Sequence, residues 1–485
     1  MSATAAAPTV IEAIRARAAR RPDHPALAGE GACSYAELSA AADRIAAALR
    51  AAGVREGDRV GLVARQGRPF VEHALGILAA GACMAPIPED TAARALAAHV
   101  REAHLHHLLV AGAEPALRSF ADVAPADGRG DAAFRALRPA YLRFTSGTTS
   151  RRKGVVLGHA AIQARLDRAN AGLRIGEDDR VLWLLPMAHH FVVSILLYLR
   201  EGATILLPAG SLARPILELG QAARATVVYA SPFHYHLLSK DASDLRLDAV
   251  RLAVSTAEGL RAEVARRFAA RFGRPLVQAL GIMEVGLPVL NLASAASKPD
   301  ALGRPLPGYD VWLRGEDGAR LAQTAPDRTG EICIRGPGLL DAYLSPWTPA
   351  AALLEQGSFR TGDQGWFDAD GDLWLAGRRA NRINLAGMKF FCEEVEAVLD
   401  AAPGVRQSRV SARLHPQLGE IPVAEFVPED PAAPPAAREL LAWLRDRLPA
   451  YKVPRTLTAV AALPRTATGK LARASGGATP GPGEA

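Results

Sequence analysis

The chain has 485 residues, of which 49% are apolar and 22% are charged. It is therefore long enough for a large buried core and more than one domain, and its composition excludes a disordered protein. The formal net charge is +7, but no short window concentrates lysine and arginine, so we expect no nucleic-acid partner.

Helix and strand signals alternate through the first part of the chain. Residues 10–19 and 35–52 have helical spacing, residues 58–63 form an apolar run typical of a buried strand, and residues 70–82 have the pattern of the following helix. Further strands, each followed by an amphipathic stretch, are expected at 180–185, 204–207, 225–229 and 252–255. Strands that alternate with helices of this length predict a parallel β/α architecture.

The pattern changes from about Gly303. Short alternating segments such as 310–314 and 330–336 are bounded by Gly, Pro and Asp, which indicates antiparallel strands and turns. A compact α+β unit follows Gly377, and residues 474–485 have the composition of a disordered tail. We therefore predict an α/β protein with a large N-terminal domain (1–377), built from β/α subdomains, and a small α+β C-terminal domain (378–473).

The cysteines and the apolar segments favour a cytoplasmic protein. Residues 1–20 have no apolar core of signal-peptide length, and the most apolar window, 191–199, is far shorter than the ~20 residues of a spanning helix. The four cysteines lie far apart and form no Cys-x-x-Cys pair: Cys33, Cys83, Cys333 and Cys392. This spacing argues against zinc and against a disulfide framework.

A loop rich in small hydroxyl residues follows the apolar segment that begins at Tyr141. It reads Thr145-Ser-Gly-Thr-Thr-Ser-Arg-Arg-Lys153-Gly and leads into another strand. Glycine lets backbone N–H groups surround an anion, and hydroxyls add donors. No GxxxxGK[ST] string is present, so this is not a Walker A loop. By itself such a segment is usually a polar turn between strands.

Three later segments each place a charged side chain in a loop or hairpin. A buried strand runs into Glu284, whose carboxylate suits Mg²⁺. Asp363 precedes Arg378 by fifteen residues, and a carboxylate with an arginine suits the two hydroxyls of a ribose. Lys470 lies in a Thr-Gly loop near the end of the chain. Taken singly, each segment has an ordinary structural explanation. Glu284 is then a solvated loop charge, the segment with Asp363 is a hairpin with a turn at Asp370-Gly371, and Lys470 is a surface lysine.

Together, in this order and spacing, the segments resemble the superfamily of acyl-CoA synthetases, firefly-luciferase-like enzymes and peptide-synthetase adenylation domains. The resemblance extends from about residue 10 to 473. Further matching segments are Tyr35-Ala-Glu-Leu with Gly57-Asp-Arg-Val, Gly330-Glu-Ile-Cys-Ile-Arg-Gly and Gly377-Arg-Arg-Ala-Asn-Arg-Ile-Asn-Leu-Ala-Gly.

The resemblance implies ATP and Mg²⁺ as cofactors and a first step in which a carboxylic acid is adenylated. A lysine between two reacting anions offsets their repulsion most in the transition state. Catalytic roles are implied for Lys470, Thr148 and Glu284, with Glu284 as the metal ligand. Nucleotide contacts are implied for Thr145, Ser146, Gly147, Thr148, Thr149, Lys153, Ala257, Glu258, Leu280, Gly281, Met283, Asp363 and Arg378.

The resemblance also implies a second step, in which the acyl group passes to a pantetheine thiol. In similar enzymes the C-terminal domain rotates on a hinge, here near Arg379-Ala380, and such motions rest on a few residues. The rotation withdraws Lys470 and brings the segment from Gly387 to Lys389 to the thiol channel. The thiol belongs to CoA or to the phosphopantetheine of a carrier protein acting in trans.

The chain departs from the family pattern at four places. Leu280 replaces the aromatic residue that stacks on adenine, and Met283 replaces a threonine. The family's Gly-x-Pro-Lys-Gly stretch reads Ser150-Arg-Arg-Lys-Gly here, and Ala380 replaces the usual acidic or lysine hinge residue. The charged residues that the first step requires remain. We therefore expect an active enzyme with a modified site.

The acid-binding region most resembles stand-alone aryl-acid-activating enzymes, through Pro186-Met-Ala-His-His and Ile383-Asn-Leu-Ala-Gly. His189 would line the acid pocket and His190 would contact a ring hydroxyl, although both could instead pack within a loop. A bulky Met283 favours a flat or short acid, so an aryl or a short to medium apolar acid is expected. Further pocket candidates are Ser231, Thr256, Ala257, Gly281 and Met283.

Two alternatives to the acid–thiol ligase stay open. The enzyme could stop at the adenylate and pass it to another nucleophile, or the chain could be a degenerate homologue kept for binding. Product formation that depends on pantetheine distinguishes the acid–thiol ligase from the first alternative. Release of pyrophosphate with some acid distinguishes it from the second, for which we expect none.

Overall fold

In the computed structural model, the described residues are 9–112, 114–120, 129–144, 153–378, 381–385, 388–415, 419–465 and 471. The chain packs as two compact units. Among described residues, the first unit comprises those up to 144 and the ranges 153–311 and 334–359, and the second comprises 312–333 and those from 360 onward. The predicted domain boundary at 377/378 concerns a moving domain and stays a prediction. The expected tail, residues 474–485, lies outside the described residues.

A nine-stranded sheet forms one half of the first unit. Its central strands are parallel, as predicted, because each is joined to the next through a helix. The expected strands at 180–185, 204–207, 225–229 and 252–255 are all present within one or two residues. The strand order is β15 (Arg304–Pro305), β14 (Gly286–Leu290), β13 (Leu276–Ile282), β12 (Leu252–Ser255), β11 (Val227–Ala230), β9 (Arg180–Trp183), β10 (Thr204–Leu207), β1 (Pro25–Gly29) and β2 (Cys33–Ser34).

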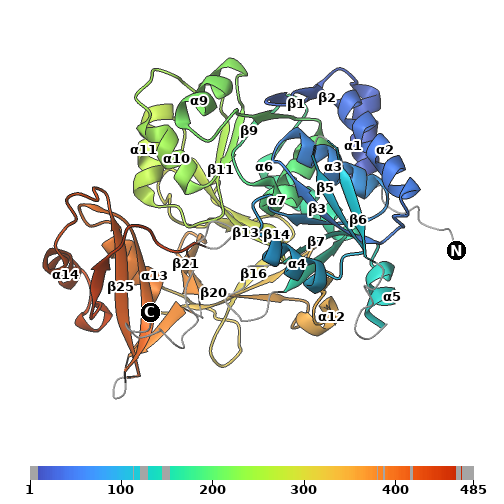
Figure 1. The fold of residues 1–485 in the computed structure, drawn as a ribbon. Coiled ribbons are helices and arrows are strands. Elements are labelled where there is room, and N and C mark those ends of the chain that lie inside the picture. Colours follow the sequence, from blue (N-terminus) through green and yellow to red (C-terminus); the bar gives the residue numbers. More distant parts are fainter. Residues whose placement is uncertain are drawn as a thin grey trace. The chain divides into compact units, whose positions relative to one another are not determined.

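Three helices cover one face of this sheet, namely α9 (Ala213–Ala222), α10 (Pro232–Lys240) and α11 (Ala262–Phe272) (Figure 1). Their apolar stripes meet the strands in one buried cluster, in which Tyr235 and Phe268 are fully buried. The Tyr235 hydroxyl donates to the carbonyls of Val228 (3.0 Å) and Val254 (2.9 Å), so burial leaves it hydrogen-bonded.

An eight-stranded sheet forms the other half of the first unit. Its order is β19 (Thr348–Pro349), β18 (Ala342–Tyr343), β8 (Gly154–Gly158), β7 (Pro139–Phe144), β4 (Cys83–Ile87), β3 (Arg59–Ala64), β5 (His107–Ala111) and β6 (Ala116–Ser119). The predicted strands before and after the Ser/Thr-Gly loop are present as β7 and β8, and they pair antiparallel.

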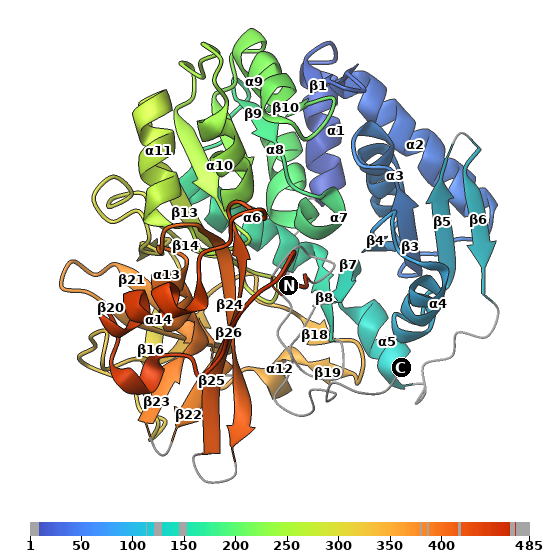
Figure 2. The same cartoon turned by 60° about the vertical axis from the view of Figure 1, so that its left-hand side comes forward.

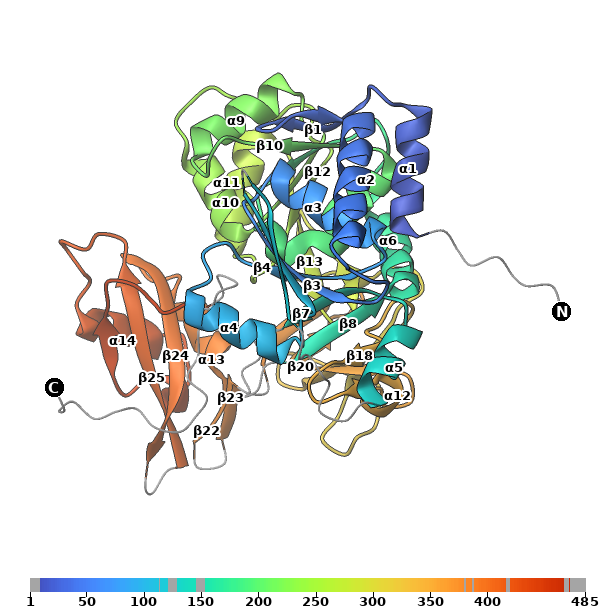
Figure 3. The same cartoon turned by 45° about the vertical axis from the view of Figure 1, so that its right-hand side comes forward.

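Two helices of the first unit begin where the sequence predicts them. Both α1 (Val10–Arg20) and α2 (Tyr35–Ala51) start with a capping box, Thr9 with Glu12 and Ser34 with Glu37, which satisfies the first free N–H groups. Figure 3 shows α2 beside α3 (Arg68–Ala79). The remaining helices are α4 (Ala93–Glu102), α5 (Arg129–Ala136), α6 (His159–Leu173), α7 (Met187–His190), a π-helix (Phe191–Ile195), α8 (Leu196–Glu201) and α12 (Ala350–Leu353).

The second unit holds two sheets. One has the order β16 (Asp310–Arg314), β17 (Gly330–Arg335), β20 (Phe359–Phe367) and β21 (Leu373–Arg378). The other contains β23 (Met388–Phe391), β22 (Arg382–Leu385), β25 (Gly419–Pro428) and β24 (Val405–His415), with β26 (Leu457–Ala459) paired to β25 (Figure 2). Helices α13 (Cys392–Leu399) and α14 (Ala437–Arg445) contribute to its apolar core, and a 3₁₀ turn spans Ala450–Lys452.

Two expectations about the whole chain can be compared with these elements. All four cysteines are free and buried, in agreement with the predicted absence of disulfides. Among the residues that the structure describes, no helix has the length and apolar character needed to cross a membrane.

Candidate active site

The site of the first unit lies where the parallel strands of the nine-stranded sheet end. The chain runs from β9 to β10 on one side of β9 and then crosses to β11 on its other side. Ligands of open α/β sheets bind outside the carboxyl ends of the strands at such a reversal. His189, Ser231 and Thr256 follow β9, β11 and β12 at this edge.

His189 is held by a half-buried strand residue, Arg143 of β7. The Arg143 guanidinium donates to the His189 carbonyl oxygen and to its Nδ1, the latter at 3.2 Å. A guanidinium can only donate, so Nδ1 accepts and the ring proton of neutral His189 lies on Nε2. Burial lowers the pKa of Arg143 from its ordinary value. The half-buried His189 therefore has an N–H donor on the side of the ring away from Arg143.

His190 and the segment after it have an irregular backbone. The His190 ring stands edge-on to Trp183 with centroids 6.4 Å apart, and its carbonyl accepts the Ser194 hydroxyl. A π-helical turn over Phe191–Ile195 follows directly. Such turns inside helices often occur at functional sites. Both histidines are half-buried, so the two readings of the sequence, pocket wall and loop packing, stay compatible with their placement.

Ser231 and Thr256 provide hydroxyls at the ends of β11 and β12, the two strands that follow β9 in the sheet order. The Ser231 hydroxyl lies 2.8 Å from Nδ1 of His234, and burial lowers the pKa of His234 to about 4, which keeps it neutral at pH 7. Thr256 is buried and donates to the carbonyl of Ala279. Among the residues that the structure describes, a Cβ on Gly281 would meet only the Thr256 hydroxyl, at 3.5 Å.

Residues expected around the nucleotide follow β12 and β13. Ala257 has φ +78°, a conformation that residues with a side chain adopt rarely and that tends to mark functional loops. Glu258 and Leu280 are half-buried, and Leu280 lies opposite Val289 of β14. Met283 is half-buried in the turn that follows β13.

Glu284 lies at the tip of the tight turn between β13 and β14. Its Oε1 accepts a hydrogen bond of 2.8 Å from the Tyr343 hydroxyl, and Oε2 accepts none among the described residues. Burial, and then the charge of Glu284, raises the pKa of Tyr343, so the phenol stays protonated and donates. The Lys153 ammonium lies 4.9 Å from the Tyr343 ring centroid. A carboxylate with free lone pairs is a donor set that Mg²⁺ accepts.

The second unit contains the predicted ribose pair. Asp363 of β20 and Arg378 of β21 are cross-strand partners, and Arg378 Nε lies 3.0 Å from Asp363 Oδ1. Asp363 is buried, and its backbone N–H donates to the Thr361 hydroxyl at 3.0 Å. The hairpin that the sequence suggested at Asp370-Gly371 is present too, so hairpin and ion pair coexist.

Lys389, predicted for the thiol channel, is exposed on β23 and bonds to Glu316 at 3.2 Å within the same unit. That hydrogen bond, with the charges of Lys389 and Arg382, lowers the pKa of Glu316. The remaining predicted residues lie outside the described part of the chain: Thr145, Ser146, Gly147, Thr148, Thr149, Arg379, Ala380, Gly387 and Lys470.

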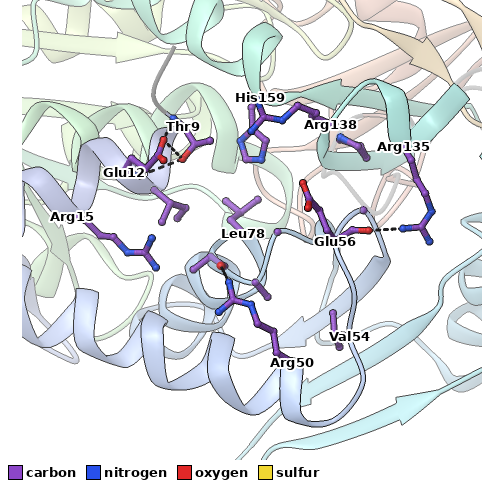
Figure 4. Close-up of a pocket in the computed structure, with 16 residues that line it drawn as sticks. Thr9, Glu12, Arg15, Arg50, Val54, Glu56, Leu78, Arg135, Arg138 and His159 are labelled. Carbon is purple, nitrogen blue, oxygen red and sulfur yellow. Dashed lines mark hydrogen bonds between the residues drawn. The ribbon is translucent and has the colours of Figure 1, made fainter. Parts of the chain in front are cut away.

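A cavity of about 600 Å³ in the first unit shares no lining residue with these groups (Figure 4). Its lining is charged, but several of its cations already have partners. Arg15 pairs with Asp43, Arg50 donates to a backbone carbonyl, and Arg135 pairs with Asp58 at 2.9 Å. We therefore assign no ligand to this cavity.

Three contributors to the site were not predicted from the sequence. Arg143 has a visible signal, since it is a charge inside the apolar strand Tyr141-Leu-Arg-Phe. Tyr343 has none, because it is 59 residues from Glu284 and belongs to the other sheet of the first unit. His234 lies three residues after Ser231, the N-cap of α10, so local helix geometry places the two side chains together and their spacing was an available signal.

Comparison with known proteins identifies relatives over nearly the whole chain. Family models described as AMP-binding enzyme and AMP-binding enzyme C-terminal domain match residues 14–344 and 394–470. A feruloyl-CoA synthase from Amycolatopsis sp is 30% identical, over 94% of this chain and 96% of the relative. A 3-hydroxybenzoate/4-hydroxybenzoate–CoA ligase from Thauera aromatica is 30% identical, over 92% and 91%. The crystal structure of ATP-bound MatB from Rhodopseudomonas palustris superposes with a TM-score of 0.83 at 25% identity, covering 96% and 97%.

Proposed function

The chain belongs to the AMP-binding enzyme family, and from that premise we propose an assignment of its substrate and of its site residues. The protein is an ATP-dependent, AMP-forming ligase that converts a carboxylic acid into acyl-AMP and pyrophosphate and transfers the acyl group to a thiol. The thiol is that of CoA or of a carrier-protein phosphopantetheine. The assignment of the acid and of each residue's role is our proposal.

The observation that carries the assignment of the first step is the Glu284 turn. Its carboxylate is held at a strand end by Tyr343, with Lys153 over the same phenol ring. Glu284 is proposed to ligate Mg²⁺, which neutralises charge on the departing pyrophosphate. Lys153 and the loop residues 145–149 are proposed to bind the phosphates, and Asp363 with Arg378 the ribose hydroxyls. Lys470 is proposed to bridge the acid carboxylate and the α-phosphate.

The acid is proposed to be aromatic with an oxygen substituent. Two of the relatives are named for feruloyl and hydroxybenzoyl substrates. In this chain, the N–H of His189, fixed on Nε2 by Arg143, is a directed donor for such an oxygen, and Ser231 supplies a second polar group nearby in the sheet order. A site built to bond a substrate oxygen discriminates strongly against the analogue that lacks it.

The test is ATP–pyrophosphate exchange with matched acids: benzoate against 3- and 4-hydroxybenzoate, cinnamate against ferulate, and medium-chain fatty acids. Lys470→Ala should abolish exchange while retaining ATP binding. Exchange driven best by fatty acids would contradict the aryl assignment, and exchange that persists in the lysine variant would contradict the role of Lys470. Thioester formation with CoA, compared with a phosphopantetheinylated carrier protein, identifies the acceptor.

The role of Arg143 is tested by Arg143→Met with the same acids. Without the guanidinium, the proton of His189 can move to Nδ1, so the directed donor is lost. We expect KM to rise about 2–10-fold for hydroxylated acids, which corresponds to the loss of one hydrogen bond of about 0.5–1.5 kcal/mol, and to change little for the unsubstituted acids. Equal changes for both sets would refute this reading, and Arg180→Met, a partly buried arginine at the start of β9, is the control.

A further inference from the structure

A buried arginine outside the predicted site holds the turn that carries Glu284. Arg165 of α6 is 2% exposed, and all three of its guanidinium nitrogens donate to backbone carbonyls. Nη1 bonds to the Met283 carbonyl at 2.6 Å, Nη2 bonds to the Glu284 carbonyl at 2.8 Å, and Nε bonds to the Gly338 carbonyl. Hydrogen bonds from a charged donor are stronger than neutral ones and have fixed directions.

Two glycines give the Arg165 side chain its space. Gly286 has φ +104°, and a Cβ there would lie 3.2 Å from Cγ of Arg165. Gly338 has φ +75°, and a Cβ there would lie 2.7 Å from the same atom, too close without a shift of the side chain. Both the backbone conformation and the close approach require glycine at these positions, so the surrounding backbone is shaped around the guanidinium stem.

Among the described residues, the other bonds to this turn come from the backbone and from two phenols, Tyr343, which bonds to the Glu284 carboxylate, and Tyr309. The Val285 N–H closes the turn on the Ile282 carbonyl at 3.0 Å, and the Leu340 N–H donates to the Glu284 carbonyl at 2.7 Å. The Tyr309 hydroxyl contacts the Val285 carbonyl at 3.4 Å. Arg165 is therefore the charged side chain whose hydrogen bonds join this turn to helix α6.

Helix α6 lies close in sequence to the proposed phosphate-binding loop. It begins at His159, directly after β8, and β8 follows Lys153 and the Ser/Thr-Gly loop. Arg165 thus fixes the Glu284 turn to the helix that follows β8, the strand that leads out of the proposed phosphate-binding loop. A shift of the turn would move the carboxylate relative to that loop, and displacements of this kind are costly for metal and phosphate contacts.

We propose that Arg165 is a positioning residue, which orients the Glu284 turn so that its carboxylate can ligate the divalent cation of the metal–ATP complex. The inference rests on the proposed function of Glu284 as the metal ligand. Residues that orient a metal ligand typically change metal affinity about 10–100-fold when they are replaced. A purely structural role would change the stability of the unit and leave the affinity for the metal untouched.

The test uses the full-length protein and measures binding in place of turnover. ATP affinity is measured by calorimetry in EDTA, and Mn²⁺ affinity of the protein–ATP complex is measured by electron paramagnetic resonance. For Arg165→Met we expect ATP affinity in EDTA within about twofold of wild type and Mn²⁺ affinity reduced about tenfold or more. Arg165→Lys, which retains the charge but not the fork of donors, should lie between.

The matched control is Arg59→Met. Arg59 is equally buried in the same unit, at 1% exposure, and donates to the His104 carbonyl at 2.6 Å and to Asp131 at 3.0 Å. Its loss should lower the melting temperature and leave the Mn²⁺ affinity unchanged. If Arg165→Met does not fold, Gly338→Ala displaces the same side chain while keeping its charge, and it should lower the Mn²⁺ affinity as well.

Two results overturn the inference, and they are distinguishable. Wild-type Mn²⁺ affinity in Arg165→Met, Arg165→Lys and Gly338→Ala, combined with a loss in Glu284→Gln, refutes the positioning role and leaves the function of Glu284 intact. Unchanged Mn²⁺ affinity in Glu284→Gln itself refutes the metal role of Glu284, and with it the inference.

Discussion

The hydrogen bond between Tyr343 and Glu284 offers a direct test of the proposed metal site. Tyr343→Phe removes one oxygen and keeps the ring that lies near Lys153. Tyr343 is only 6% exposed, so water cannot readily replace the lost hydroxyl. The substitution therefore leaves Oε1 of Glu284 without its donor while the rest of the turn is unchanged.

The size of the effect follows from the charge on the acceptor. A hydrogen bond to a charged group contributes about 1.5–3 kcal/mol, which corresponds to a factor of about 10–100 in a rate or binding constant. We expect kcat/KM for ATP in acid-dependent pyrophosphate exchange to fall by that factor. The melting temperature should change little, because the ring continues to fill its place in the core.

A double-mutant cycle with Glu284→Gln separates this bond from other effects of the substitution. The two losses should be less than additive, because both variants disrupt the same contact. Additive losses, or wild-type activity in Tyr343→Phe at limiting Mg²⁺, would refute the reasoning. Tyr235→Phe is the control, since it removes a buried hydroxyl that bonds only to backbone carbonyls in the core, and it should lower stability without changing the Mg²⁺ dependence.

Three further predictions follow from single contacts. Asp363→Asn should raise KM for ATP about 10–100-fold with little change in KM for the acid, because a charged acceptor for the ribose is lost; an effect on the acid alone would contradict the ribose role. Leu280→Tyr should tighten ATP binding, measured by calorimetry, by about 0.5–1.5 kcal/mol, since it restores an aromatic surface for the adenine; unchanged affinity would mean that Leu280 does not face the base. His234 has its pKa lowered from 6.5 to about 4 by burial, so between these values the unfolded chain binds more protons and stability is lost as pH falls from about 6.5 towards 4. Comparison of wild type with His234→Gln in urea unfolding at pH 7 and pH 5 should show the smaller loss in the variant, with a bound of about 3 kcal/mol on the full effect; equal losses would refute the assignment.

Much of the local structure could be predicted from short stretches of sequence. The capping boxes at Thr9 and Ser34 place the starts of α1 and α2, because the pairs that satisfy free N–H groups are only three residues apart. The strand at 204–207 is apolar on both faces and has the predicted bounds. The family and the order of its motifs were also legible, since each motif is a continuous run of residues.

Only the tertiary structure shows which side chains contact the residues of those motifs. Tyr343 and Arg143 belong to the eight-stranded sheet, whereas Glu284 and His189 follow strands of the nine-stranded sheet. The contacts of Tyr343 with Glu284 and of Arg143 with His189 therefore arise from packing between segments of two sheets. Arg165 is one of two arginines in helix α6, and the sequence of the helix gives no sign that this arginine bonds to three carbonyls. Sequence periodicity encodes which face of an element is buried, but partners across elements depend on packing and register. The groups proposed for the reaction are therefore visible in the sequence, whereas the side chains that contact them across the fold are seen only in the tertiary structure.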